Sequence, residues 1–254
     1  MSQDSFSTIG FFEDFLFVGD DGGVALVDAT PQVYNNILVT SISGVVTIDS
    51  TVDEPGGVAS FSGAGGAEDG VALMSAPYKP ADGTIVMGCR FKLSVLTTWR
   101  AFIGFAETVD RDETVPPFSL SGTTLTDNDA GQCFGLYYDT AATTDDWRAA
   151  GSSDGTIFTT CAPLGVRANS TPVADQWIIV RVEIDPTGAA RAYLGDSSVD
   201  PAGTQLKLVY TLPAGNLDTT ASYLPLVVLT DPSTTDPTWE VDYFWARGSR
   251  DWTV

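Results

Sequence analysis

Aromatic rings and carboxylates are crowded together in the middle of the chain. Tyr138 and Trp147 supply flat rings, and Asp139, Asp146 and Arg148 lie beside them in the sequence. A sugar site needs a ring to stack on the apolar face of a pyranose, together with carboxylates and an arginine to bond its hydroxyl groups. These five residues are therefore the candidate ligand-binding site. The simpler structural interpretation places one of the two adjacent tyrosines in the core and lets Trp147 cover a sheet edge, with its apolar body buried and its polar tip wet.

Basic and aromatic residues also gather near the C-terminal end of an otherwise acidic chain. Arg247, Arg250 and Trp252 are of the residue types that dominate binding hot spots in protein interfaces. They predict a docking surface for a negatively charged partner. A closing strand, whose tryptophan packs on the body of the protein and whose arginines pair with local aspartates, fits them equally well.

The sequence contains no histidine. Ser-His-Asp and Cys-His nucleophilic sites and histidine-ligated metals are therefore excluded. Residues 151–155 read G-S-S-D-G and match the nucleophile elbow by letter, but that motif needs a strand–turn–helix context and a histidine. We predict a hairpin turn there. No catalytic residue and no metal ligand is assigned, and the chain is predicted not to be an enzyme.

Charge and composition narrow the classes of partner. The chain has 254 residues, a formal net charge of −21 and a pI near 4.1. Such acidity argues against binding to nucleic acid, because phosphates are attracted to a basic protein surface. It argues equally against binding to an anionic membrane surface. Three widely spaced cysteines indicate reduced thiols rather than a disulfide framework. The N-terminus lacks the pattern of a signal peptide, and no apolar run is long enough to cross a bilayer.

Alternation of apolar and polar residues dominates the chain and predicts strands. Residues 85–95 form a long half-buried strand, and residues 177–185 and 190–194 form a hairpin closed by a D-P-T-G turn. The remaining strands are expected at 11–18, 38–48, 57–62, 71–75, 99–106, 132–139, 156–161, 205–212, 223–229 and 239–248. Residues 110–129 and 139–147 are expected to be long loops with functional or contact roles. Apolar residues nowhere keep helical spacing for three turns, so the fold class is all-β with little helix.

The order of these segments resembles a known family. The strands around F-F-E-D-F, I-V-M-G-C-R-F-K-L-S-V, W-R-A-F-I-G-F-A-E, G-Q-C-F-G-L-Y-Y-D and W-E-V-D-Y-F-W-A-R resemble the concanavalin A-like lectin/glucanase domains over residues 10–252. The resemblance implies a two-sheet antiparallel jelly-roll sandwich. It also implies one domain over residues 1–254, with residues 1–9 expected to form a flexible N-terminal arm.

The resemblance implies a function as well. Single sandwiches of this kind without a signal peptide are similar to structural proteins of tailed phages. The leading hypothesis is a non-enzymatic virion protein that decorates or cements the capsid and binds the major capsid protein, as a homo-oligomer. The alternative is a tail-fibre or receptor-binding module that recognises a host-surface glycan. Either protein would be assembled in the host cytoplasm and located in the virion.

Two further properties of the family concern catalysis and calcium. Glucanases carry Glu-x-Asp-x-x-Glu on one strand, and here Glu240 and Asp242 supply the first two acids while Trp245 replaces the third. A glycan hydrolase is therefore disfavoured. Lectins of this fold often hold calcium near their sugar site, and the oxygen-rich residues 126–131 leave a calcium site open, although the EF-hand spacing fails there.

Overall fold

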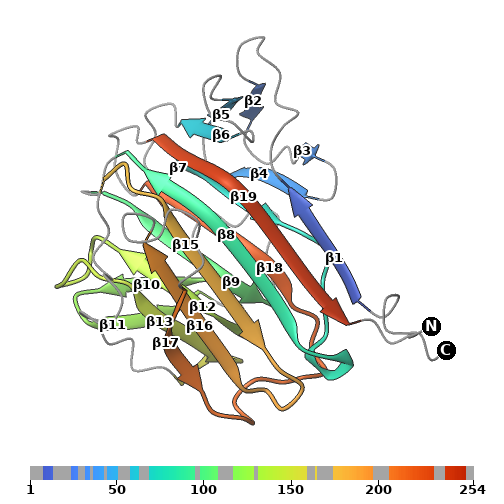
Figure 1. Cartoon of the computed structure of the whole chain (residues 1–254). Helices are drawn as coiled ribbons and strands as arrows, with labels where there is room; N and C mark the ends of the chain where they lie inside the picture. Colours follow the sequence, from blue (N-terminus) through green and yellow to red (C-terminus); the bar gives the residue numbers. More distant parts are fainter. Residues whose placement is uncertain are drawn as a thin grey trace.

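The chain folds into two large antiparallel sheets that pack face to face (Figure 1). The computed structural model describes residues 8–13, 24–27, 32–34, 37–42, 45–50, 58–62, 69–94, 98–107, 117–128, 131–158, 164, 174–196, 206–231 and 238–249. Within these ranges the helical content is one 3-10 turn, η2 (Pro80–Asp82). The described residues contain no helix that could span a bilayer. The predicted fold class, an all-β antiparallel jelly roll, is confirmed.

The first sheet, sheet A, has nine strands. In spatial order they are β17 (Lys207–Leu212), β16 (Ala190–Asp196), β15 (Ile178–Ile184), β8 (Ile85–Leu93), β19 (Thr238–Ser249), β6 (Ala59–Ser62), β5 (Val45–Ser50) and β2 (Val24–Val27), with β1 (Thr8–Glu13) also paired to β19.

The second sheet, sheet B, has eight strands, and a short separate hairpin accompanies it. Sheet B runs β14 (Thr156–Ile157), β13 (Arg148–Ser153), β12 (Cys133–Asp139), β9 (Arg100–Ala106), β18 (Leu224–Asp231), β7 (Asp69–Met74), β4 (Ile37–Ile42) and β3 (Gln32–Tyr34). The hairpin consists of β10 (Phe118–Ser121) and β11 (Thr124–Asp127).

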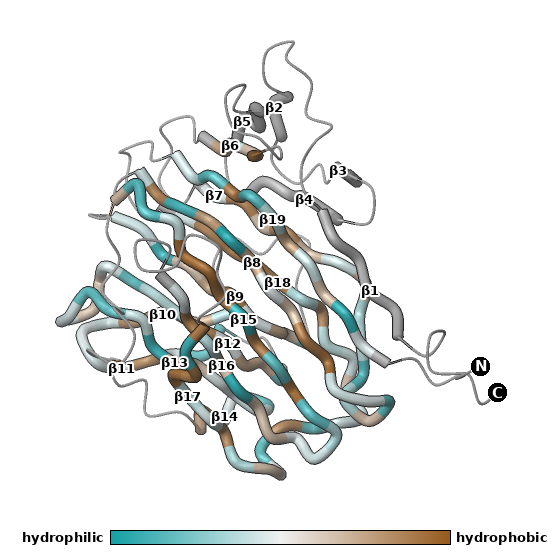
Figure 2. Tube along the Cα trace, in the orientation of Figure 1, coloured by the Kyte–Doolittle hydropathy of each residue, from teal (hydrophilic) through white to brown (hydrophobic). Residues whose placement is uncertain are grey.

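The alternation of apolar and polar residues in the sequence reflects the two faces of each strand, as predicted. Successive side chains of a strand point to opposite faces, and on β8 and β15 one set is buried between the sheets while the other faces outward. Figure 2 shows hydrophobic and hydrophilic positions alternating along these strands. The inward side chains of both sheets form the main core, which includes Trp99, Trp239 and Phe91.

The predicted hairpin of residues 177–194 is confirmed as β15 and β16, which pair from Ile178–Asp196 to Ile184–Ala190. Its turn closes through a hydrogen bond from Gly188 N to Asp185 O at 2.9 Å, as a four-residue turn requires. Gly188 has φ of +74°, and a Cβ there would lie 2.6 Å from Leu217 O. Glycine therefore meets both the conformational and the spatial demand of this turn.

The N-terminal third departs from the prediction. The single strand predicted over residues 38–48 is wrong: it is two strands, β4 in sheet B and β5 in sheet A. Ile42 and Val45 are three positions apart, so strict alternation breaks between them, at Ser43 and Gly44. The prediction of one strand overlooked this break. β1 begins at Thr8 and pairs with Ser249, which places the end of the expected arm in a strand. Residues 1–7 lie outside the described part.

The long loop predicted over residues 110–129 contains the hairpin β10–β11, which sequence analysis did not find. Phe118 and Leu120 from this hairpin pack on Phe102, Tyr137 and their neighbours, which point away from the main core. A second, smaller core thus covers the outer side of sheet B. The sequence did not predict this hairpin because β10 and β11 have only four residues each, too few to show a clear alternation of apolar and polar residues.

Candidate functional site: the outer face of sheet A

Charged and aromatic side chains line the side of sheet A that faces away from the core. They belong to the positions between the buried residues of β8, β15, β16 and β19. We call this surface the outer face of sheet A and define it by Arg90, Lys92, Trp177, Arg181, Glu183, Asp185, Arg191, Tyr193, Glu240, Asp242, Trp245 and Arg247.

Aromatic rings on this face are paired with cations. Arg90 Cζ and Lys92 Nζ lie 4.5 and 4.9 Å from the centroid of the Trp177 ring. Arg181 Cζ lies 5.3 Å from the centroid of Tyr193. A cation over the negative face of a ring is attracted by the ring quadrupole. These contacts hold the rings in place at the surface.

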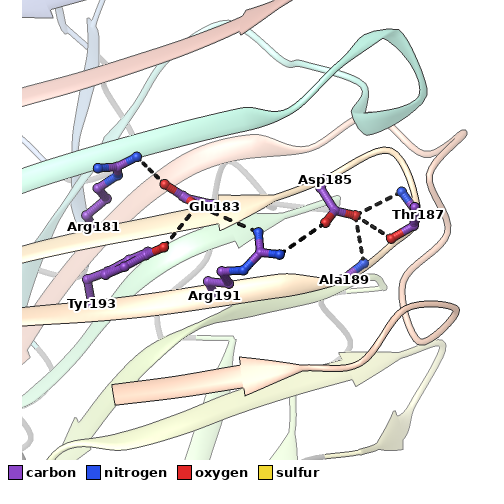
Figure 3. Close-up of polar contacts among 7 residues, drawn as sticks. All are labelled: Arg181, Glu183, Asp185, Thr187, Ala189, Arg191 and Tyr193. Carbon is purple, nitrogen blue, oxygen red and sulfur yellow. Dashed lines mark hydrogen bonds and ion pairs between the residues drawn. The ribbon is translucent and has the colours of Figure 1, made fainter. Parts of the chain in front are cut away.

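Glu183 is the centre of a polar network on β15 and β16, drawn in Figure 3. Its carboxylate forms an ion pair with Arg181, lies 3.9 Å from Arg191 Nη1, and accepts a hydrogen bond from Tyr193 Oη at 3.3 Å. Burial, and then the negative charge of Glu183, raise the pKa of Tyr193. The tyrosine hydroxyl therefore stays a proton donor at neutral pH.

Arg191 extends this network to the hairpin turn (Figure 3). Its Nη2 lies 3.7 Å from Asp185 Oδ2. Asp185 Oδ1 accepts hydrogen bonds from Thr187 N, Thr187 Oγ1 and Ala189 N at 2.9, 2.5 and 3.2 Å. Burial acts to raise the pKa of Asp185, but the donors of Thr187 and Ala189, with Arg191, outweigh it and hold the pKa below its usual range.

Trp245 forms an aromatic platform across two strands. It is paired with Gly88 of β8, and a Cβ on Gly88 would lie 2.5 Å from Trp245 Nε1 and 2.6 Å from its Cε2. The indole thus occupies the space that a side chain on β8 would take. Trp245 is only half-buried, so part of its ring stays open to solvent, and Arg247 Cζ lies 5.8 Å from the ring centroid.

The two acids of the partial glucanase motif also lie on this face. Glu240 Oε2 is 2.8 Å from Lys92 Nζ, and Asp242 forms an ion pair with Arg90. The pairing of β19 with β8 shifts register between Val241 and Tyr243. Because of this bulge, the burial pattern of the strand changes phase along its length.

The balance of charge on the outer face of sheet A differs from that of the whole chain. The chain has 12 basic and 33 acidic residues. Five of those basic residues lie on this face, namely Arg90, Lys92, Arg181, Arg191 and Arg247. Four of the acidic residues also lie there, namely Glu183, Asp185, Glu240 and Asp242. An acidic protein thus presents one nearly neutral, aromatic surface.

The rings of the predicted sugar site lie elsewhere, in the main core. Tyr138 and Trp147 are each 1% exposed. Tyr138 stacks on Trp99 with the ring centroids 4.1 Å apart, and Trp147 packs edge-on to Trp99 at 6.1 Å. Neither ring presents a face to solvent in this arrangement. This placement corresponds to the structural interpretation of these residues; a sugar-binding role for them stays a prediction.

Asp139 joins the hairpin β10–β11 to sheet B. Its carboxylate is fully buried and accepts hydrogen bonds from Tyr137 Oη at 2.6 Å, Leu120 N at 3.3 Å and Ala141 N at 2.8 Å. Arg100 Nε lies 3.1 Å from the same carboxylate. Four different groups thus hold one buried charge, as a buried carboxylate requires.

The other two residues predicted to bind sugar are also buried, at 4% exposure for Asp146 and 1% for Arg148. Arg148 Nη2 donates a hydrogen bond to Thr144 O at 2.8 Å. Of the predicted docking residues, Arg247 is exposed on the outer face of sheet A. Arg250 and Trp252 lie outside the described residues.

The calcium site left open by the sequence is described only in part. Ser152 Oγ donates a hydrogen bond to Asp127 Oδ2, and Asn128 Oδ1 accepts one from Ser119 Oγ at 3.3 Å. Asp129 lies outside the described residues. Within the described ranges, no group of three or more cysteine, aspartate or glutamate side chains could hold a metal ion.

Arg247 was predicted from the sequence as a docking residue, but no binding role was predicted for Trp177 or Trp245, the two tryptophans of the outer face of sheet A. Trp177 and Trp245 come from segments far apart in the chain, and only the sheet brings them to one surface. The alternation in residues 239–248 could have identified Trp245 as an outward-facing residue. Its neighbour Phe244 is buried, and adjacent side chains of a strand point to opposite faces of the sheet. An aromatic residue on the outward side of a strand is a candidate for binding.

The comparisons with known proteins identify the fold. The sequence matches no protein-family model and no curated protein. A protein of unknown function from Shewanella oneidensis MR-1 is similar in structure, with 14% identity, a TM-score of 0.55 and coverage of 96% of this chain and 87% of that one. The carbohydrate recognition domain of Emp47p is similar with 10% identity, a TM-score of 0.52 and coverage of 91% and 99%.

Peanut lectin is a more distant neighbour, with 12% identity, a TM-score of 0.47 and coverage of 96% of this chain and 99% of that one. At such identities the likeness concerns the fold and not the activity. The chain has a two-sheet antiparallel jelly-roll fold of the concanavalin A-like type.

Proposed function

We propose that the chain is a non-enzymatic glycan-binding module and that its ligand lies on the outer face of sheet A. The observation that carries this proposal is the half-buried Trp245 ring, which is spread over Gly88 and has the guanidinium of Arg247 beside it. A flat ring supports the apolar face of a sugar. Arg247 next to the ring, and Arg181 across β8, bond the hydroxyl groups at the sugar rim.

The alternative surface is less suited to a ligand. The outer side of sheet B is covered by the hairpin β10–β11, whose Phe118 packs on Phe102 and Tyr137 of the sheet, and all three side chains are fully buried. A ligand there would have to displace a packed core. The outer face of sheet A needs no such rearrangement, since the charged face is already partly exposed.

The structural neighbours support the class of ligand. One of them is named as a carbohydrate recognition domain, and it shares the fold over 91% of this chain. A shared fold raises the expectation of a shared function without supplying the site. The site is therefore inferred from the residues of this chain.

The non-enzymatic part of the proposal rests on the carboxylates. A glycosidase needs one carboxyl group protonated and a second ionised, on either side of the bond that is cleaved. Glu240 and Asp242 are each held by a cation from β8, Lys92 and Arg90. Two ion-paired carboxylates on one strand do not supply that arrangement.

A glycan array probed with the fluorescently labelled full chain tests the proposal. We expect binding to at least one glycan, loss of that binding in Trp245→Ala, and no loss in Leu208→Ala, which removes an exposed apolar side chain from β17 of the same sheet. Absence of binding to every glycan contradicts the proposal, as does unchanged binding by Trp245→Ala. Release of reducing ends from a bound glycan contradicts its non-enzymatic part.

The virion role implied by the sequence resemblance is a second candidate. The feature that favours it is the concentration of Trp, Tyr and Arg on one face, because these residues are enriched in protein interfaces. Electron microscopy of phage particles from the source, with gold-labelled antibody against the chain, tests it. Label over the head supports capsid decoration, and label on the tail supports a receptor-binding module. Particles without label contradict both roles.

A further inference from the structure

One guanidinium beside the Trp245 platform is not matched by a carboxylate. Arg90, Lys92 and Arg181 lie over aromatic rings and each also forms an ion pair. Arg247 lies over Trp245, its side chain is exposed, and it forms no ion pair with any residue in the described ranges. Among the described cations that lie over rings, Arg247 is thus the one whose charge is available to a ligand.

On the side of β8, the floor next to Arg247 offers no competing polar group. On β8, Val86 pairs with Arg247 and Gly88 pairs with Trp245. Val86 is an apolar residue at 4% exposure, and Gly88 has no side chain. An anionic group that approaches Arg247 from above therefore meets the guanidinium, the indole and an apolar floor.

The next strand adds a second cation and no free anion. Across β8, Arg181 of β15 pairs with Gly88, and Glu183 pairs with Val86. Adjacent strands are about 4.8 Å apart, so Arg181 and Trp245 stand roughly 10 Å from each other at the backbone. The negative charge of Glu183 is held by Arg181 and Arg191. It therefore repels an incoming anion less than a free carboxylate would.

We infer that the ligand of this platform is an acidic glycan, which stacks one sugar ring on Trp245 and binds Arg247 through its carboxylate or sulfate group. The planar guanidinium matches either group with two parallel hydrogen bonds. This inference rests on the proposed function and specifies its ligand. The chain as a whole repels polyanions because of its charge of −21, so recognition depends on this local pair and not on long-range attraction.

Binding to matched polymers tests the inference. The probes are polygalacturonate, alginate and hyaluronan for the carboxylate, each with its carboxyl-reduced form, and heparin for the sulfate, with a form that is both desulfated and carboxyl-reduced. Wild-type protein is expected to bind at least one acidic polymer about tenfold more tightly than its neutral form, which corresponds to about 1.4 kcal/mol. Arg247→Gln is expected to remove that preference. Lys207→Gln, which removes an exposed cation from β17, is expected to retain it.

The outcomes separate the inference from the proposed function. Equal affinity for acidic and neutral forms, or an unchanged preference in Arg247→Gln, overturns the acidic ligand and leaves glycan binding intact. Binding to neutral glycans on the array without binding to any of the four acidic polymers overturns it as well. No binding to any glycan overturns both. Arg247 is exposed, so its substitution leaves the core unchanged, and an unaltered melting temperature verifies this in each variant.

Discussion

The indole of Trp245 occupies the space in which a side chain on Gly88 would lie, with 2.5 Å between its Nε1 and the position of a Cβ on Gly88. Gly88 is thus part of the candidate site although it has no functional group. A strand interior is a poor place for glycine unless another group needs the space. Here that group is the ring of the neighbouring strand.

Gly88→Ala is therefore expected to displace the Trp245 ring. Because the ring is half-buried, it can move outward at little cost in stability, but the platform is lost. We expect a several-fold loss of glycan affinity with a small change in melting temperature, measured by titration and thermal unfolding. The matched control is Gly195→Ala, whose Cβ meets a flexible methyl of Leu206 at 2.9 Å. Equal affinity in both variants would show that the ring position is irrelevant.

Asp139 is expected to contribute strongly to stability. Asp139→Ala removes the carboxylate that faces Arg100 and the acceptor for the buried donors Leu120 N and Tyr137 Oη, so the hairpin loses its attachment to sheet B. Loss of one member of a buried ion pair costs about 3–5 kcal/mol. Urea unfolding measures this cost. Asp145→Ala removes an exposed carboxylate from the same segment, and a loss as large as that of Asp139→Ala would refute this role.

Asp185 makes the stability depend on pH in a defined direction. Its pKa is lower in the folded protein than in the unfolded chain, where it is about 3.9. The contribution is therefore fully present above that value and is lost as the pH falls through the lowered pKa. In urea unfolding, Asp185→Asn should be less stable than wild type at neutral pH, and the gap should close below about pH 4. A gap independent of pH would contradict this origin.

Two of the three cysteines are expected to be unreactive in the folded protein. Cys89 and Cys133 are fully buried, and burial raises the pKa of both thiols, to which the charges of Asp242 and Asp127 respectively add. A thiol reacts as its thiolate. With an aromatic disulfide reagent at mildly alkaline pH, at most one thiol should react before denaturation and all three afterwards. Rapid reaction of two thiols in native protein would disprove the burial.

Several features could be read directly from local sequence. The hairpin of β15 and β16 is specified by two alternating segments and a turn with proline and glycine in suitable places, and it forms as predicted. The position of β8 follows from its alternation alone. These features are local, because strand propensity and turn chemistry depend on residues that are adjacent in the chain.

The sequence alone could not predict which face of each strand would be buried by other parts of the protein. Alternation separates two faces, but sequence neighbours do not reveal whether another sheet, a hairpin or solvent lies against each face. Tyr138 and Trp147 are therefore equally good as sugar platforms or as core residues until Trp99 is found packed against them.

The sequence by itself determined the all-β class, the hairpin of β15 and β16, and the strong negative charge. The tertiary structure decided that hairpin β10–β11 covers sheet B and that Trp177 and Trp245 share one open face with five cations. The physical reason is that strand formation is a local property, whereas burial is set by contacts between segments distant in the chain, such as that between Gly88 and Trp245.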